Sequence, residues 1–178
     1  MLKTTQATLT ERAPRFLLND IVRYWRTICI DFEGKSSGGD DDDRKWGARN
    51  AKLRTSRKLL FTGGFIPVLL CRLIERDHMQ DFLLRWFNAT PLDRLATAFL
   101  FVDLAEVGVR ALGAYDRWIG LMSDEDVRAE LRDVRYDTRD HSPAFAEIRE
   151  LGREFEDALG SLLFSSRLGP VTRAYGIL

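Results

Sequence analysis

Residues 15–33 read RFLLNDIVRYWRTICIDFE, and their apolar side chains recur at every third or fourth position. This spacing matches one face of an α-helix with 3.6 residues per turn, so the stretch predicts an amphipathic helix from about residue 15 to residue 33. The apolar stripe consists of Leu17, Ile21, Trp25, Ile28 and Phe32. Helical signals of this kind recur along almost the whole chain.

Start and stop signals divide the next part of the chain into further helices. A second helix is expected over residues 46–62, with an interruption at Gly63-Gly64 and Pro67 and a short apolar helix continuing to about residue 78. Another short helix is expected over residues 81–88. The clearest start follows, with Thr90 as N-cap, Pro91 at the first helical position and Asp93 two residues later.

The helix that begins at Pro91 is expected to be long and to bend near Gly108 or Gly113. Ser123 with Asp126 resembles a capping box and predicts the start of a shorter helix. Ser142-Pro143 begins the last helix, and Gly169-Pro170 ends it. No alternating apolar–polar run bounded by turn signals predicts a strand. The sequence therefore predicts an all-α fold, a single helical bundle of about six or seven helices.

The whole chain, residues 1–178, is expected to form a single helical domain. Within it, residues 1–14 are expected to be a flexible N-terminal segment and residues 170–178 a C-terminal tail. Residues 34–45, which contain the four-aspartate run at 40–43, are expected to form a mobile acidic loop.

Composition and charge exclude several classes of protein. Lys plus Arg and Asp plus Glu number 27 each, so a polyanion site must come from local clustering of cations. Cys29 and Cys71 lie in apolar helical runs and are interpreted as reduced core thiols of a cytoplasmic protein. The N-terminus lacks an apolar signal core, and the longest apolar run, residues 65–71, is too short to span a bilayer. Secreted, disulfide-stapled and membrane-spanning classes are therefore excluded.

Local clustering of cations occurs in the first third of the chain. Residues 44–58 contain seven Lys or Arg residues and no carboxylate. Polar residues at helical spacing on residues 15–33 and 46–62 could converge on a phosphate group, because Arg supplies planar paired donors and Lys a compact charge. The candidate binding residues are Asn19, Arg23, Arg26, Arg49, Lys52, Arg54 and Ser56. The alternative is a solvated basic surface that pairs with the acidic residues of 147–157.

Metal-based and histidine-based chemistry have less support. Four consecutive carboxylates at 40–43 do not converge well on an octahedral ion, so a solvated acidic loop is favoured and no metal site is predicted. His78 and His141 lack metal-ligand spacing, although each follows an arginine as Arg-x5-His, the spacing of HEPN-type ribonucleases. Arginine is common in this chain, so such matches arise by chance. No Walker loop, dinucleotide-binding glycine pattern or nucleophile elbow is present, and no catalytic residue is predicted.

Two segments carry a resemblance to a known family. RFLLNDIVRYWRTICIDFEGK at 15–35 and KWGARNAKLRTSRKLLFTGG at 45–64 resemble the helical region of bacterial nucleotidyltransferases of the DNA polymerase β-like superfamily, distantly akin to protein-PII uridylyltransferases. The resemblance covers residues 15–70. The residues that match are Asn19, Arg23, Tyr24, Trp25, Arg26, Lys52, Arg54, Ser56 and Arg57.

The resemblance implies an accessory role. In the family, an α/β catalytic domain with Gly-Ser and Asp-x-Asp motifs precedes the helical region, and both enclose a nucleoside triphosphate. Gly160-Ser161 is not followed by Asp-x-Asp on a strand, and the sequence predicts no α/β domain. The expected partner is therefore a catalytic domain supplied in cis or in trans, which would also bring magnesium. The chain alone is expected to bind no cofactor and to be inactive. The alternatives are a HEPN-like ribonuclease or RNA-binding module and a helical protein-interaction domain, so binding of nucleic acid is left open.

Overall fold

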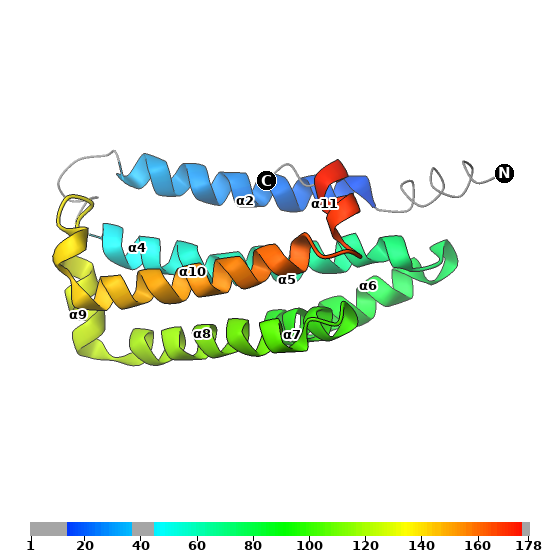
Figure 1. Cartoon of the computed structure of the whole chain (residues 1–178). Coiled ribbons are helices and arrows are strands. Elements are labelled where there is room, and N and C mark those ends of the chain that lie inside the picture. The colour runs from blue at the N-terminus through cyan, green and yellow to red at the C-terminus, as the bar shows by residue number, and fades with distance from the viewer. Residues whose placement is uncertain (1–13, 37–44, 176–178) are drawn as a thin grey trace. The chain divides into compact units, whose positions relative to one another are not determined.

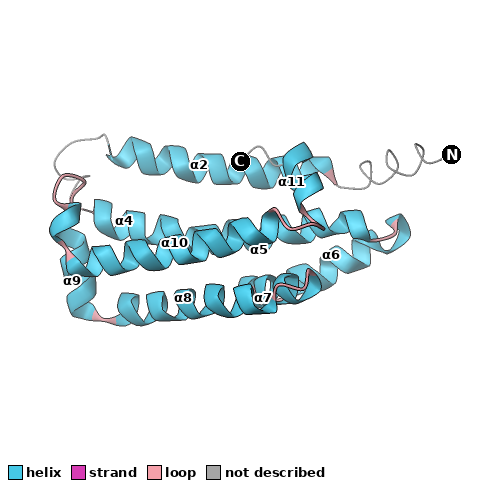
Figure 2. Ribbon diagram, viewed as in Figure 1, coloured by secondary structure: helices cyan, strands magenta, loops and turns pink. Residues whose placement is uncertain are grey.

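The computed structural model describes residues 14–36 and 45–175, and its regular elements are helices (Figure 1). In chain order they are α2 (Arg15–Ser36), α4 (Trp46–Lys52), α5 (Lys58–Leu70), α6 (Met79–Asn88), α7 (Pro91–Phe101), α8 (Ala105–Ser123), α9 (Glu125–Asp133), α10 (Pro143–Leu163) and α11 (Gly169–Tyr175). A π-helical segment, η1 (Leu53–Arg57), joins α4 to α5. Figure 2 shows no strand in the described residues, so the predicted all-α class is confirmed. With residues 46–70 taken as one helix, the described chain has eight.

The chain divides into two compact units. Unit 1 takes in Met1–Trp25, Leu59–Ala105 and Gly160–Leu178, and unit 2 takes in Arg26–Lys58 and Glu106–Leu159. The division falls inside four helices: α2 after Trp25, α5 after Lys58, α8 after Ala105 and α10 after Leu159. Each unit has buried apolar side chains of its own.

The core of unit 1 surrounds α5, which is apolar on all of its faces. Nearly every residue of α5 after Lys58 is buried, as expected of a helix at the centre of its unit. Phe65 of α5 and Phe99 of α7 are fully buried among the largest core side chains. Cys71 follows α5 directly, and burial raises the pKa of its thiol to about 12. That thiol therefore stays protonated at neutral pH.

The predicted interruption at Gly63-Gly64 and Pro67 is wrong, because residues 46–70 form one continuous helical segment. Pro67 has no N–H to donate to the carbonyl of Gly63, four residues earlier. Instead, Nη1 of Arg94 in α7 donates to this carbonyl at 3.2 Å. Gly63 also permits the close approach of α7, since a Cβ there would lie 3.1 Å from the Cβ of Pro91. A side chain distant in sequence therefore replaces the hydrogen bond that proline removes.

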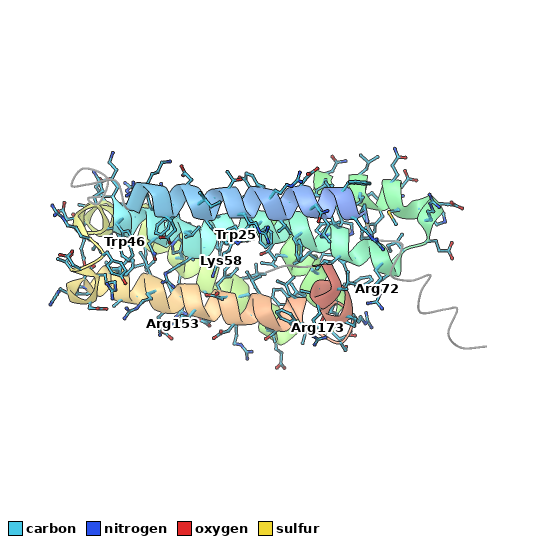
Figure 3. All side chains as sticks on the ribbon, turned by 90° about the horizontal axis from the view of Figure 1, so that it is seen from above. Trp25, Trp46, Lys58, Arg72, Arg153 and Arg173 are labelled. Carbon is cyan, nitrogen blue, oxygen red and sulfur yellow. The ribbon has the colours of Figure 1, made fainter. Side chains whose placement is uncertain are left out.

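The core of unit 2 is rich in aromatic rings. The ring of Trp46 lies 5.2 Å from that of Phe145, 5.5 Å from that of Tyr136 and 6.5 Å from that of Phe32. Figure 3 shows where Trp46 lies at the beginning of α4. The apolar face of α10 adds Phe145, Ile148 and Phe155, all three of which are fully buried. These rings and side chains fix the position of α4, which carries several of the predicted site residues.

Helix starts follow the predicted caps at two of three places. Thr90 caps α7 by accepting a hydrogen bond from the backbone N–H of Asp93 at 3.2 Å. Ser142 caps α10 by accepting from the N–H of Phe145 at 3.0 Å. Ser123 is instead the last residue of α8, and Asp124 caps α9 by accepting from the N–H of Asp126 at 2.8 Å. The short carboxylate of Asp124 satisfies the free N–H groups of the first turn, so the start lies one residue later than expected.

The long helix expected after Pro91 does not bend at Gly108 or Gly113, because it ends at Phe101 and a new helix begins at Ala105. Asp103 adopts a left-handed backbone conformation with φ 61°. The N–H of Leu104 donates to the carbonyl of Phe99 at 2.9 Å, which is the bonding pattern of a Schellman helix end. An aspartate therefore takes the position that glycine usually occupies.

Helices extend into both the expected loop and the expected C-terminal tail. Helix α2 continues to Ser36, three residues into the predicted loop at 34–45, and residues 37–44 lie outside the described part of the chain, as do residues 1–13. Most of the expected tail belongs to α11, because Gly169-Pro170 begins a helix as well as following the end of α10 at Leu163. Proline fits the first turn of a helix, where its missing N–H costs nothing.

Candidate anion-binding site

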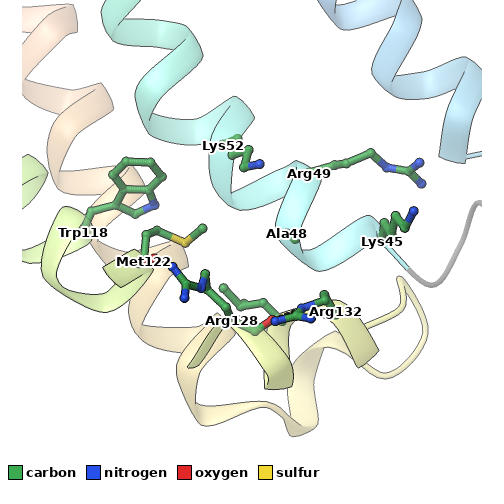
Figure 4. Close-up of a pocket in the computed structure, with 9 residues that line it drawn as sticks. Lys45, Ala48, Arg49, Lys52, Trp118, Met122, Arg128 and Arg132 are labelled. Carbon is green, nitrogen blue, oxygen red and sulfur yellow. Dashed lines mark hydrogen bonds between the residues drawn. The ribbon is translucent and has the colours of Figure 1, made fainter. Parts of the chain in front are cut away.

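A cavity of about 590 Å³ lies in unit 2 and is lined by α4, the C-terminal part of α8 and α9 (Figure 4). Its cationic lining consists of Lys45, Arg49, Lys52, Arg128 and Arg132. Its apolar lining consists of Ala48, Trp118, Met122 and Leu131. The lining, which comes from described residues only, contains no carboxylate. The volume falls within the range of about 300–1,000 Å³ that is usual for small-molecule sites.

Helix α4 presents its cations to the cavity because its other face is fixed to the core. The three cations of residues 45–52 are spaced four and three positions apart, so they share one face of the helix. On the buried side, the N–H of Gly47 donates to the carbonyl of Val134 at 3.0 Å. A Cβ on Gly47 would lie only 2.6 Å from the Cβ of Val134, so the backbones approach closely here. This contact sets the rotation of α4 against the segment that follows α9.

The two arginines of α9 are held by one carboxylate. Arg128 and Arg132 are four residues apart, and both hydrogen-bond to Glu125, Arg132 through Nη2 at 2.7 Å. These hydrogen bonds, that of Arg128 first, hold the pKa of Glu125 below its usual range. Arg128 also donates to the carbonyl of Met122 at 3.3 Å. The shared carboxylate therefore fixes the two guanidinium groups while neutralising only part of their charge.

The lysines of the site differ from its arginines in their contacts. Arg49 donates through Nη2 to the carbonyl of Lys35 at 3.1 Å. Lys45 and Lys52 are exposed, and among the described residues neither forms an ion pair. An ammonium group without a carboxylate partner needs no competing ion pair to be broken before it binds an anion. Lys45 and Lys52 are therefore the side chains best placed to contact a phosphate.

Trp118 contributes the apolar wall and one polar atom. It is buried, with 6% of its surface exposed, and its ring lies 5.5 Å from that of Tyr115. Its indole Nε1 is fully buried and has no hydrogen-bond acceptor among the described residues. Figure 4 shows this nitrogen on the side of the ring that faces Met122. A buried N–H without an acceptor is uncommon in folded proteins.

The structure brings together some of the predicted site residues but not all of them. Arg49 and Lys52 line the cavity. Arg26 is exposed on α2 and is not part of the lining. Asn19 and Arg23 are exposed on the part of α2 that belongs to unit 1, where Arg23 lies 3.8 Å from Asp20.

Arg54 and Ser56 lie in the π-helical segment and also stay outside the lining of the cavity. The Nε of Arg54 donates to Oδ1 of Asn50 at 2.6 Å, and its aliphatic part packs on Gly152 of α10. Burial lowers the pKa of Arg54, which is partly offset by the nearby carboxylate of Glu156. Ser56 donates to the carbonyl of Lys52 at 3.3 Å. Arg54 therefore packs on α10, and the hydroxyl of Ser56 is bonded within its own helix.

The alternative of a basic surface paired with acidic residues applies to part of the cluster. Nζ of Lys58 lies 2.8 Å from Oε2 of Glu156, one of the acidic residues at 147–157. No such pair involves Lys45 or Lys52 within the described chain. Lys58 and Arg54 therefore face α10, whereas Lys45, Arg49 and Lys52 line the cavity.

Apart from Arg49 and Lys52, the residues that line the cavity were not predicted as site residues, although Lys45 belongs to the cationic run at 44–58. Arg128 and Arg132 have a signal in their spacing of four residues, which places both on one face of a helix. Trp118 has no such signal, because a tryptophan at helical spacing usually belongs to a core. Its unsatisfied N–H becomes visible only in the packed structure.

The two histidines lie in different units. His78 lines a second cavity of about 400 Å³ in unit 1, together with Asp81, Phe82 and Trp86 among others. His141 is exposed in a turn of unit 2, Arg139–His141. Among the described residues, no three His, Cys, Asp or Glu side chains come together in a way that could hold a metal ion.

Comparison with known proteins does not indicate a function, so a function has to be inferred from the chemistry of the site. No protein-family model, curated protein or solved structure matches this chain. A separate property of the described helices is that none is both long and apolar enough to cross a membrane.

Proposed function

We propose that this chain binds the phosphate groups of a nucleoside triphosphate in the cationic cavity of unit 2, as a helical accessory part of a nucleotidyltransferase. The observation that carries the proposal is the lining itself, five cations without a carboxylate. The resemblance of residues 15–70 to the helical region of these enzymes supports it, since Lys52, one of the cations of the cavity, is among the residues that match.

The lining suits a triphosphate in both charge and shape. Arginines held in place by Glu125 offer paired N–H groups, which match the oxygens of a phosphate group. The lysines offer compact charges that can follow the phosphate chain. The apolar wall of Trp118, Met122 and Leu131 offers a surface for the organic part of the ligand.

The role of the chain in this proposal is binding and not catalysis. Transfer of a nucleotide by this superfamily needs carboxylates that hold two metal ions, and these belong to the α/β catalytic domain. We propose that such a domain acts with this chain, in cis or in trans, and that magnesium arrives with the triphosphate. The proposal includes a cytoplasmic location, which the reduced thiols of Cys29 and Cys71 favour.

Replacing Lys52 with alanine is expected to weaken binding of Mg-ATP by about ten- to a hundredfold, because a charge-assisted contact of about 1.5–3 kcal/mol is lost. The dissociation constant is measured by isothermal titration calorimetry on the full chain. Arg26→Ala is the matched control, since it removes an exposed cation of unit 2 that does not line the cavity. Its dissociation constant should equal that of the unaltered chain.

Two results would contradict this proposal. Equal affinity of the Lys52→Ala chain and the unaltered chain would leave the cavity without a role in binding. Equal losses in Lys52→Ala and Arg26→Ala would indicate a diffuse basic surface. The accessory role has a separate test, because a coding sequence in frame or beside this one should contain Gly-Ser followed by Asp-x-Asp on strands.

A further inference from the structure

Besides its cations, the cavity has one neutral residue, Trp118, with a hydrogen-bond donor that is unsatisfied within the described chain. Nε1 of Trp118 is a hydrogen-bond donor that cannot accept, and it is buried in the wall of the cavity without an acceptor from the described residues. A phosphate site built from cations alone has no need of such a donor. A buried N–H of this kind calls for an acceptor, and a ligand in the cavity reaches it once the flexible side chain of Met122, which lies on the same side of the ring (Figure 4), moves aside.

The ring of Trp118 is held in one place. Its centroid lies 5.5 Å from that of Tyr115 with an interplanar angle of 32°, and the ring of Tyr115 lies 5.8 Å from that of Phe155, which is fully buried. Met122 lies one helical turn further along α8 and lines the same cavity. The donor therefore cannot turn away towards solvent without disturbing the core of unit 2.

The geometry points to an organic phosphate as the ligand, one that places a hydrogen-bond acceptor of its organic part on Nε1 of Trp118 while its phosphate groups contact the cations. This inference rests on the proposed function, because it concerns the same cavity. It makes Trp118 the residue that distinguishes a nucleoside triphosphate from an inorganic polyphosphate of similar charge. A phosphate oxygen can accept from an indole N–H as a ring nitrogen can, but Trp118 lies in the apolar part of the lining with Met122 and Leu131, which suits the organic part of the ligand. The lysines and arginines contact both kinds of anion.

The test compares two anions on two chains. Mg-ATP and magnesium tripolyphosphate are titrated into the unaltered chain and into the Trp118→Phe chain, which keeps an aromatic ring and loses the donor. We expect Trp118→Phe to weaken the binding of Mg-ATP about three- to tenfold, in line with the loss of one hydrogen bond. The affinity for tripolyphosphate should not change. An unchanged affinity for Mg-ATP, or an equal loss for both anions, overturns the inference.

The results that would contradict the proposed function differ from those that would contradict the role of Trp118. If Lys52→Ala leaves Mg-ATP binding unaltered, or if neither anion binds the unaltered chain, the phosphate site itself is absent. If Lys52→Ala weakens the binding of both anions and Trp118→Phe weakens the binding of neither, the phosphate site is supported and the role of Trp118 is wrong.

A second measurement needs no substitution of Trp118. The chain contains four tryptophans, so a 15N-labelled sample gives four indole N–H resonances. Mg-ATP should shift the Trp118 resonance downfield, as a new hydrogen bond does, and tripolyphosphate should leave it in place. A Trp118 resonance that does not move at saturating Mg-ATP overturns the inference even if Trp118→Phe does not fold.

Discussion

Replacing Arg94 with alanine is expected to lower the free energy of unfolding by about 3–5 kcal/mol, because one guanidinium group satisfies three backbone carbonyls. It donates to Gly63 at 3.2 Å, to Phe87 at 2.9 Å and to Ala89 at 3.0 Å. The side chain of Arg94 is partly buried, and this burial lowers its pKa. Chemical denaturation followed by circular dichroism measures the change.

A double-mutant cycle with Pro67 isolates the contribution of the Gly63 carbonyl. Pro67→Ala restores an N–H four residues after Gly63, so the helix can supply its own donor. The cost of Arg94→Ala should then be about 1 kcal/mol smaller in the Pro67→Ala chain than in the unaltered one. Arg110→Ala, which removes an exposed arginine of α8, is the control and should change stability by less than about 0.5 kcal/mol. Strictly additive costs of the two substitutions would contradict this account.

Arg94 also explains why the sequence alone misplaced a helix boundary. Gly63-Gly64 and Pro67 are helix-breaking residues, and local rules predict an interruption there. The residue that offsets the missing hydrogen bond lies 31 positions away, in another helix. Local propensity contains no information about such a donor, so the continuity of residues 46–70 could not be predicted.

The break after α7 was missed for a different reason. The sequence predicts one long helix with a bend near Gly108 or Gly113, because glycine is the residue that most easily departs from helical geometry. The structure uses Asp103 instead, and the carboxylate of Asp103 accepts a hydrogen bond from Arg167 at 3.0 Å. Aspartate tolerates this conformation better than most residues, but it is too common in loops and helices to mark a boundary by itself.

The sequence predicts which kinds of residue line the site, but only part of their arrangement in space. The cations of α4 follow from their helical spacing, and two of the predicted residues, Arg49 and Lys52, line the cavity. The expected partner of α4 was α2, whereas the structure places the arginines of α9 across the cavity. Which face of α4 is buried depends on the contact between Gly47 and Val134, and such rotations are set by packing that sequence spacing cannot specify.

That contact gives the second large effect. Gly47→Ala is expected to lower the free energy of unfolding by about 3 kcal/mol, because the added Cβ would lie 2.6 Å from the Cβ of Val134 and 2.7 Å from the carbonyl oxygen of Leu131. Neither neighbour is the flexible end of a long side chain, so the backbone of α4 has to move. The movement also threatens the hydrogen bond from the N–H of Gly47 to Val134.

Gly113→Ala in α8 is the matched control, because the same added methyl group meets nothing within 4 Å. It should raise stability by up to about 1 kcal/mol, through the better helix propensity of alanine. Since Gly47 also sets the rotation of α4, its alanine variant should bind Mg-ATP more weakly even at temperatures where it stays folded, whereas Gly113→Ala should bind as the unaltered chain does. Equal melting temperatures for the two variants would show that α4 does not pack closely against Val134. A destabilised Gly47→Ala chain with undiminished affinity would show that the cations of α4 act independently of that contact.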